Sequence, residues 1–316
     1  MTWRFLVLIA LVCTISLGCK ESAKSAEDYN KQGNAKYRLG DKQGVIADYS
    51  EAIRFNPDFA VAYSNRGNAK NELGNKQGAI ADYSEAIRIK LDEAANYYSV
   101  RGIVKDDLGD KQGAIADYNE AIRLNPNSFK DYYNRGLAKY KLGDKQGAIA
   151  DFTKAIRIYP DLIAAYNNRG IVKDDLGDKQ GAIADYNEAI RLDPKYAVAY
   201  YNRGLAKSDL GNKQGAISDY NEAIRLNPKY ADAYNNRGLA KYKLGDKQGA
   251  IADYNEAIRL NPQDDDAYYN RGLAKSDLGN KQGALVDFRK ALELFQQQGN
   301  TEGANDARDR IRALGG

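Results

Sequence analysis

The chain has 316 residues, and its 47 lysines and arginines nearly balance its 43 aspartates and glutamates, for a formal net charge of +4. This balance indicates a well-solvated surface and not the basic excess of a nucleic-acid-binding protein. There is no histidine, and both cysteines lie within the first 19 residues. The rest of the chain lacks the nucleophile–base pairs and the common zinc ligands, which predicts a non-catalytic protein with no cofactor and no metal.

Residues 1–19, MTWRFLVLIALVCTISLGC, have the layout of a secretory signal. One positive charge, Arg4, precedes an apolar run over 5–15 that is too short to span a bilayer. The ending SLGC resembles a bacterial lipoprotein signal, in which Cys19 would be lipidated and become the first residue. Gly18 fits that pattern, whereas Ser16 stands where the pattern prefers leucine.

This resemblance implies an extracytoplasmic lipoprotein anchored to a membrane of a bacterial envelope, with residues 20–25 as a short polar tether. Two alternatives remain open at this stage. The small residues before Cys19 also suit an ordinary signal peptidase, which would give a secreted or periplasmic protein. The segment would also serve as a retained N-terminal anchor.

A repeat fills most of the remaining chain. One glycine recurs every 34 residues from Gly33 to Gly272, with a single step of 35 between Gly67 and Gly102. Such punctuation at a fixed period predicts an array of stacked units. All six prolines fall at one position of the repeat: Pro57, Pro126, Pro160, Pro194, Pro228 and Pro262.

Each unit predicts two helices. In the unit that begins at residue 231, apolar and small residues at helical spacing over 233–245 predict the first helix. Gly245 stands at its end, where a left-handed C-cap conformation favours glycine. Asp246 then serves as the N-cap of a second amphipathic helix, which Pro262 ends. Every unit has Asp or Asn at the N-cap: Asp41, Asn75, Asp110, Asp144, Asp178, Asn212, Asp246 and Asn280.

This pattern resembles the tetratricopeptide repeat over residues 26–298. The resemblance implies an all-α, right-handed superhelix of eight 34-residue helix pairs. Residues 299–316 predict a C-terminal capping helix over the exposed apolar edge. An extra residue near 90–95 is either a tolerated loop insertion or a hinge. The eight units are 26–59, 60–94, 95–128, 129–162, 163–196, 197–230, 231–264 and 265–298.

Three positions of the first helix depart from the family. Tyrosine replaces the usual tryptophan at the fourth position, and lysine replaces tyrosine at the eleventh. Arginine replaces leucine at the seventh in every unit but the first, which has Gln32. Arginine and lysine four residues apart repel each other. Each second helix carries one aspartate, such as Asp219, and we expect it to lie between Arg203 and Lys207. The alternative is that the Arg and Lys rows bind a polyanion or a cell-wall glycan.

The resemblance implies that the first helices line a concave face that binds a protein segment, either a peptide or a helix. On that face the sixth position is a row of asparagines suited to a peptide backbone, and the ninth is mostly Leu or Ile. The twelfth and thirteenth vary between units, as specificity residues do. These positions equally suit a solvated helix face, contacts between units or neutral variation. The candidate partner-binding residues are Asn65, Asn134, Asn168, Asn202, Asn236, Asn270, Leu137, Leu205, Leu239, Tyr140 and Tyr242.

One subclass of the family grips a partner's C-terminal carboxylate with basic residues on this face. Asn30, Asn96 and Val100 stand where those basic residues belong. The sequence therefore predicts a non-catalytic interaction scaffold without that clamp. The expected partners of this scaffold are a protein or peptide and, through the lipid anchor, a membrane. The sequence predicts that it binds neither nucleic acid nor metal.

Overall fold

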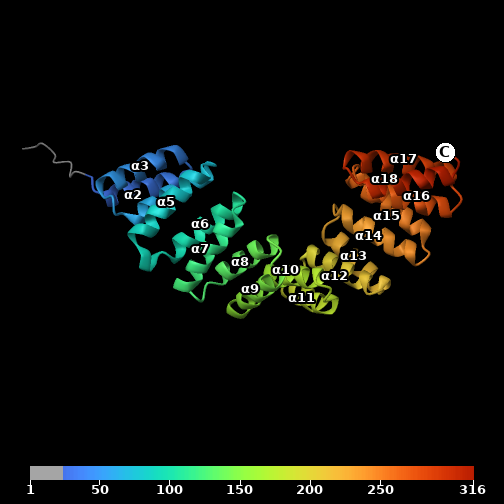
Figure 1. Ribbon diagram of the computed structural model, residues 1–316, viewed down its shortest axis with the longest axis horizontal. Helices are drawn as coiled ribbons and strands as arrows, with labels where there is room; N and C mark the ends of the chain where they lie inside the picture. Colours follow the sequence, from blue (N-terminus) through green and yellow to red (C-terminus); the bar gives the residue numbers. More distant parts are fainter. Residues whose placement is uncertain (1–23) are drawn as a thin grey trace, which may run out of the picture. The chain divides into compact units, whose positions relative to one another are not determined.

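The computed structural model describes residues 24–316, which form 17 α-helices and one 3-10 turn without a β-strand (Figure 1). The expected all-α fold is therefore confirmed. The signal segment with Cys19 and the first residues of the tether lie outside the described residues. Between residues 24 and 316, none of the helices combines the length and the apolarity that a membrane span requires.

The chain divides into two compact units at residues 138 and 139, within α8. The described part of unit 1 is 24–138. Its helices pack in consecutive antiparallel pairs, in which α2 lies on α3, α4 on α5 and α6 on α7. The helices are α2 (Ala26–Arg38), α3 (Lys42–Phe55), α4 (Ala60–Glu72), α5 (Lys76–Ile89), α6 (Ala95–Asp107), α7 (Lys111–Leu124) and α8 (Phe129–Lys141).

Unit 2 covers 139–316 and continues the same pairing. Its helices after α8 are α9 (Lys145–Ile158), α10 (Ile163–Asp175), α11 (Lys179–Leu192), α12 (Ala197–Asp209), α13 (Lys213–Leu226), α14 (Ala231–Lys243), α15 (Lys247–Leu260), α16 (Asp265–Asp277), α17 (Lys281–Gln297) and α18 (Thr301–Ala313).

The turn inside each pair has the chemistry that the sequence predicts. Gly245 has a φ of 91°, a left-handed conformation that a residue with a Cβ adopts only at a cost. The carboxylate of Asp246 then accepts a hydrogen bond from the backbone N–H of Gly249 at 2.8 Å. The seven other predicted N-caps do the same with the glycine three residues later. The predicted helix starts are confirmed.

Each pair is held by an aromatic ring of the second helix against a glycine of the first. A Cβ on Gly238 would lie 2.8 Å from the Tyr254 ring, closer than real contacts allow. Small residues therefore let the two helices approach, and the ring with its neighbouring alanines forms the core. The rings at this position are Tyr49, Tyr83, Tyr118, Phe152, Tyr186, Tyr220, Tyr254 and Phe288.

The hydroxyls of these buried tyrosines are not equally satisfied. The Tyr83 hydroxyl donates to Asn68 Oδ1 at 2.7 Å. At the equivalent position of the first helix, fifteen residues before Tyr254, stands Leu239, which has no acceptor. The Tyr254 hydroxyl is buried and has no hydrogen-bond partner among residues 24–316.

We expect Tyr254→Phe to stabilise the protein by about 1 kcal/mol and Tyr83→Phe to destabilise it by a similar amount. The first substitution removes a buried hydroxyl without a partner, whereas the second leaves the amide oxygen of Asn68 without its donor. Phe152, fully buried at the same repeat position, shows that the fold accepts the ring alone. Urea denaturation of the two variants measures both effects, and equal shifts in one direction would contradict the explanation.

The irregular joint near residue 90 is a short 3-10 turn, Leu91–Glu93, between α5 and α6. It replaces the usual proline-containing turn, and Lys90 pairs with Glu93 across it at 2.9 Å. The inserted residue is accommodated within this short turn, and a hinge at this joint stays untested.

The C-terminal helix α18 packs on α17, as the capping helix was expected to do (Figure 1). Asn300 caps its start, and Ala304 and Ala307 are buried with Phe295 and Ala291 of α17. Ile311 and Leu314 are half-buried farther along the helix, so its apolar stripe combines small residues with two larger ones.

Candidate partner-binding surface

The arginine and lysine rows are engaged within their own helix pairs. Arg203 makes a two-pronged ion pair with Asp219, with Nη2–Oδ1 at 2.6 Å and Nε–Oδ2 at 2.9 Å, and Lys207 Nζ lies 2.8 Å from Oδ2. The expected position of the aspartate between the two cations is confirmed. Five further triads are Arg66–Asp82–Lys70, Arg101–Asp117–Lys105, Arg169–Asp185–Lys173, Arg237–Asp253–Lys241 and Arg271–Asp287–Lys275.

The same arginines also link consecutive helix pairs. Arg203 Nη1 donates to Asn187 Oδ1 of the preceding second helix at 2.7 Å, and Arg66 donates to Ser50 in the same way. The arginine also lies over the tyrosine ring three residues before it, with Arg203 Cζ 5.4 Å from the centre of Tyr200. The three departures from the family thus form one polar network in place of an apolar contact.

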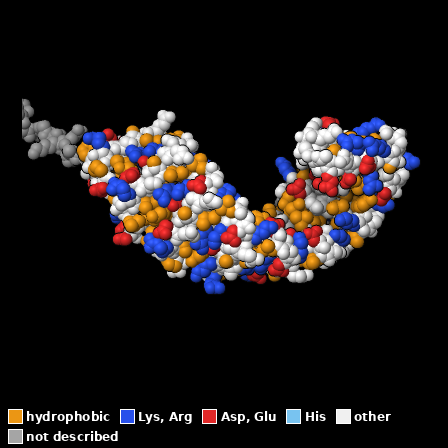
Figure 2. All heavy atoms as spheres, viewed as in Figure 1, with side chains coloured by type: hydrophobic (Ala, Val, Ile, Leu, Met, Phe, Trp, Pro, Cys, Tyr) orange, Lys and Arg blue, Asp and Glu red, His pale blue; other side chains and the backbone are white. Residues whose placement is uncertain are grey.

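Both cationic rows are held in contacts within the protein, and polyanion binding by them stays an untested alternative. The aspartates are almost fully buried, and the Arg203 and Lys207 side chains are only 17% and 23% exposed. Each aspartate offsets one of the two positive charges beside it, and the positive charge that remains in each triad lies mostly below the surface. Figure 2 shows lysine and arginine side chains scattered among acidic and hydrophobic ones on the visible face of each unit.

In unit 2 the first helices of consecutive pairs adjoin one another, α10 with α12, α12 with α14 and α14 with α16. We call the surface formed by their second, fifth, sixth, ninth, twelfth and thirteenth positions the first-helix face. In a stacked array this is the inner side, where a partner segment would contact several units at once.

The asparagine row joins neighbouring first helices. Four of the six asparagines donate their side-chain amide to the fifth position of the preceding pair, so part of their hydrogen-bonding capacity is used inside the array. The pairs are Asn65 with Asn30 at 3.1 Å, Asn202 with Asn167 at 3.0 Å, Asn236 with the Tyr201 hydroxyl at 3.1 Å, and Asn270 with Asn235 at 3.4 Å. Asn168 also has an interaction partner.

The variable twelfth and thirteenth positions form a second set of links. Tyr140 donates its hydroxyl to Asp175 of the next pair at 2.7 Å, and Tyr242 does the same to Asp277 at 2.8 Å. Lys247 adds an ion pair to Asp277 at 3.1 Å. These contacts give Tyr140 and Tyr242 a structural role, and their binding of a partner stays a prediction.

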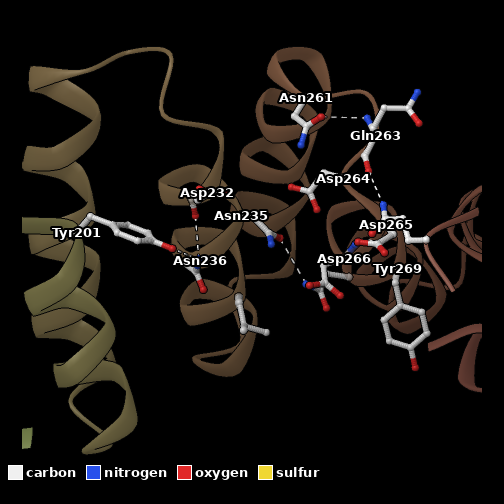
Figure 3. Close-up of a pocket in the computed structure, with 13 residues that line it drawn as sticks. Tyr201, Asp232, Asn235, Asn236, Asn261, Gln263, Asp264, Asp265, Asp266 and Tyr269 are labelled. Carbon is white, nitrogen blue, oxygen red and sulfur yellow. Dashed lines mark hydrogen bonds between the residues drawn. The ribbon is translucent and has the colours of Figure 1, made fainter. Parts of the chain in front are cut away.

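A pocket of about 590 Å³ opens on the first-helix face of unit 2, between α12, α14 and α16 (Figure 3). It brings together three of the predicted residues, Asn236, Leu239 and Asn270. Figure 3 shows Tyr201 reaching toward Asn236 from one side, with Asp264, Asp265 and Asp266 grouped at the other. Its remaining lining residues are Asp232, Asn235, Asn261, Gln263, Tyr269 and Gln298.

The acidic and aromatic part of this pocket escaped the sequence analysis. Asp264 is the N-cap of α16 and accepts a hydrogen bond from the backbone N–H of Ala267 at 2.9 Å. Asp232 and Asp266 occupy the second position of the repeat, and Tyr201 and Tyr269 occupy the fifth. Both positions belong to the first-helix face. The sequence signal for this part of the pocket was that these acidic and aromatic residues differ from those at the same positions of other repeats.

Burial and mutual repulsion disfavour the charged forms of these acids. Burial raises the pKa of Asp264 above its usual value, and the nearby Asp266 and Asp232 carboxylates add to the increase. The pKa of Asp266 is raised by burial and then by Asp265. Burial also raises the pKa of Tyr201, with a further contribution from Asp232.

The other predicted residues are distributed along both units. Asn134 lines a separate pocket of about 450 Å³ in unit 1, together with Ile103, Val100 and Lys130. Leu205 packs against the core around Tyr220, and Leu137 is partly buried on α8. The structure therefore gathers only three of the predicted residues at one pocket.

Among residues 24–316, no group of three or more histidine, cysteine, aspartate or glutamate side chains is arranged to hold a metal ion.

Family models match the repeat along most of the chain. Sequence models described as "Tetratricopeptide repeat" match residues 60–93, 129–162, 201–265 and 235–299. A model described as "TPR repeat" matches 33–74, 107–143 and 174–211. No curated protein matches the chain.

Three solved structures illustrate the likeness. A tetratricopeptide repeat protein from Parabacteroides merdae has a TM-score of 0.60 at 18% identity, over 81% of this chain and 99% of that one. YrrB, described as a TPR protein with an unusual peptide-binding site, has a TM-score of 0.50 at 21% identity, over 61% and 97%. MamA is 33% identical over 55% of this chain and 95% of its own, with a TM-score of 0.49.

The helix pairs, the shared fold and the matches along most of the sequence agree. Proteins built from this repeat are in general scaffolds for protein interactions and not enzymes. The chain belongs to the tetratricopeptide repeat family.

Proposed function

We propose that this protein binds an extended or helical segment of another protein on the first-helix face of unit 2, without catalysing a reaction. The observation that carries the proposal is the pocket between α12, α14 and α16. Its volume is in the range of ligand pockets, and it combines one apolar side chain, Leu239, with convergent amides and two tyrosines. Aromatic side chains of this kind supply most of the binding energy in many interfaces.

The amides of the asparagine row retain capacity for a partner. Asn236 donates to Tyr201 and to the Asp232 carbonyl, and none of the hydrogen bonds described for residues 24–316 uses its side-chain oxygen as acceptor. An amide oxygen placed in this way accepts a hydrogen bond from a partner's backbone N–H. The asparagine row thus supports binding to the backbone of a partner segment, and the side chains beside the row provide selectivity among partner sequences.

The variant that tests this proposal is taken from the chain itself. The first two helix pairs carry Asn34 and Asn68 at the ninth position, where they accept from Tyr49 and Tyr83. Leu205→Asn with Leu239→Asn copies that arrangement, so we expect the fold to persist while the apolar part of the face is lost.

The experiment compares capture of partners from a native membrane extract by the mature chain, by this double variant and by a control. The control is Val286→Asn, which removes an apolar side chain that is 65% exposed on α17. We expect the partner to be retained by the control and to be reduced at least roughly tenfold by the double variant. Equal recovery by all three proteins, with circular dichroism showing the same helicity, would place binding elsewhere.

We further propose that the protein acts at a membrane of a bacterial envelope, through lipid on Cys19. The support is the sequence of residues 1–19 and the polar tether that follows. Mass spectrometry of the protein purified from membranes should show a mature chain that begins at a diacylglyceryl-modified Cys19. A mature chain that is unmodified or that retains residues 1–18 would contradict the anchor.

A further inference from the structure

The pocket of unit 2 carries carboxylates that the rest of the array does not explain. Four of its lining residues are acidic: Asp232, Asp264, Asp265 and Asp266. Across residues 24–316 the buried aspartates of the second helices are paired with arginine or lysine, but none of these four makes an ion pair. Their negative charge faces the pocket without compensation from the protein.

The acidic and aromatic surface continues beyond this pocket. A second pocket of about 210 Å³ lies between α16 and α18 and shares Asp266 and Tyr269 with the first. Its other lining residues include Phe295, Glu302 and Asp306. Carboxylates alternating with aromatic rings attract a cation in two ways, through charge and through the negative face of the ring.

The repeat supplies its own comparison for this feature. At the second position of the first helix, Asp232 and Asp266 replace the Lys130, Ala164 and Val198 of the three preceding pairs. The pocket of unit 1 is lined by both Lys130 and Asp131, so its charges are mixed. The negative pocket is thus a property of the last two pairs and not of the module.

A metal ion does not suit these carboxylates. Within the described residues, no three of them converge at the spacing that a metal ion requires. The pocket is also far larger than a bare ion, and its walls include Tyr201, Tyr269 and Leu239. An ammonium or guanidinium group on an aliphatic stem matches both the charge and the apolar surface.

We propose that the pocket of unit 2 selects partner segments by seating a lysine or arginine side chain among Asp232, Asp264, Asp265 and Asp266, against Tyr201 and Tyr269. This inference rests on the proposed function and specifies the partner as a cationic segment. The charged head lies at the carboxylates, and the backbone of the segment follows the amides of Asn236 and Asn270. Binding relieves the repulsion among the four acids, which favours a cation over a neutral side chain of equal size.

The test uses the mature chain and four fluorescein-labelled heptapeptide mixtures, with every residue except cysteine allowed at the flanking positions. The central residue is lysine, Nε-acetyllysine, arginine or citrulline, so each cation is matched by a neutral analogue. Fluorescence anisotropy measures binding to the unchanged protein and to Asp232→Asn/Asp266→Asn. The control variant, Asp58→Asn/Asp161→Asn, changes the net charge equally at two exposed sites away from the pocket.

We expect the lysine and arginine mixtures to bind at least roughly tenfold more tightly than their neutral analogues, and the pocket variant alone to abolish that preference. Equal binding of charged and neutral mixtures would overturn this inference and leave the scaffold function supported. Equal weakening by the control variant would show diffuse attraction and overturn the pocket. Spermidine serves as a cation that is not part of a protein. If spermidine binds and neither cationic mixture does, a protein segment is not the occupant. If nothing binds, the inference is overturned.

Discussion

Replacing Asp219 by asparagine is expected to lower the free energy of unfolding by about 3 kcal/mol. Asp219 is 3% exposed and is the shared counter-charge of Arg203 and Lys207, both of which lie mostly below the surface. Asparagine has the same shape but no charge, so the variant leaves two partly buried cations without their anion. Urea denaturation followed by circular dichroism measures the loss.

A surface pair of the same helix gives the control for this prediction. Glu222 and Arg225 are paired at 2.9 Å but their side chains are 42% and 64% exposed, and we expect Glu222→Gln to cost no more than about 0.5 kcal/mol. Equal losses for the two variants would show that the triad contributes no more than a surface ion pair.

A second variant separates the loss of an ion pair from the worth of the whole triad. Arg203→Leu with Lys207→Tyr restores the residues usual in the family, and Asp219→Ala removes the remaining charge. We expect the triple variant to recover most of the stability lost by Asp219→Asn, because apolar replacements of a buried ionic group are often neutral or stabilising. That result would mean that the charged triad determines which helices pack together and does not add net stability to the fold.

Much of this arrangement could be predicted from the sequence, because one short module fixes it. Gly245 and Asp246 determine a turn by backbone conformation and capping, which are local effects. The pairing of Asp219 with Arg203 and Lys207 also follows from the pattern, since two like charges four residues apart on a helix need a counter-charge. The sequence does not give the burial of these pairs, and the structure shows that they lie mostly below the surface.

The candidate pocket was less accessible to prediction, because it depends on side chains from separate repeats that meet in space. Asn236 was expected to face a partner, but its amide donates to Tyr201, which lies 35 residues earlier in the chain. The acidic wall joins Asp232 of one repeat to Asp264 and Asp266 of the next. The period of the repeat identifies which positions share a face, but it gives neither the depth of a pocket nor the local balance of charge.

The helix α18 closes the last pair, and a charge placed under it should open that pair. Ala307 is fully buried against α17, and we expect Ala307→Glu to cost about 3 kcal/mol because it places an unpaired carboxylate in an apolar contact. Asn305→Glu adds the same charge to an exposed position of α18 and serves as the control. Hydrogen exchange should rise in α16, α17 and α18 of the first variant and stay unchanged in unit 1.

The same substitution connects the cap to the pocket. A hydrogen bond between Arg310 of α18 and Tyr269 raises the pKa of Arg310, and Tyr269 forms part of the pocket wall. Detachment of α18 would therefore release Tyr269 and reduce binding of the cationic peptides as well as stability. If Ala307→Glu opened the last pair but left that binding unchanged, Tyr269 would not belong to the binding surface, and the carboxylates of α14 and α16 alone would carry the selectivity.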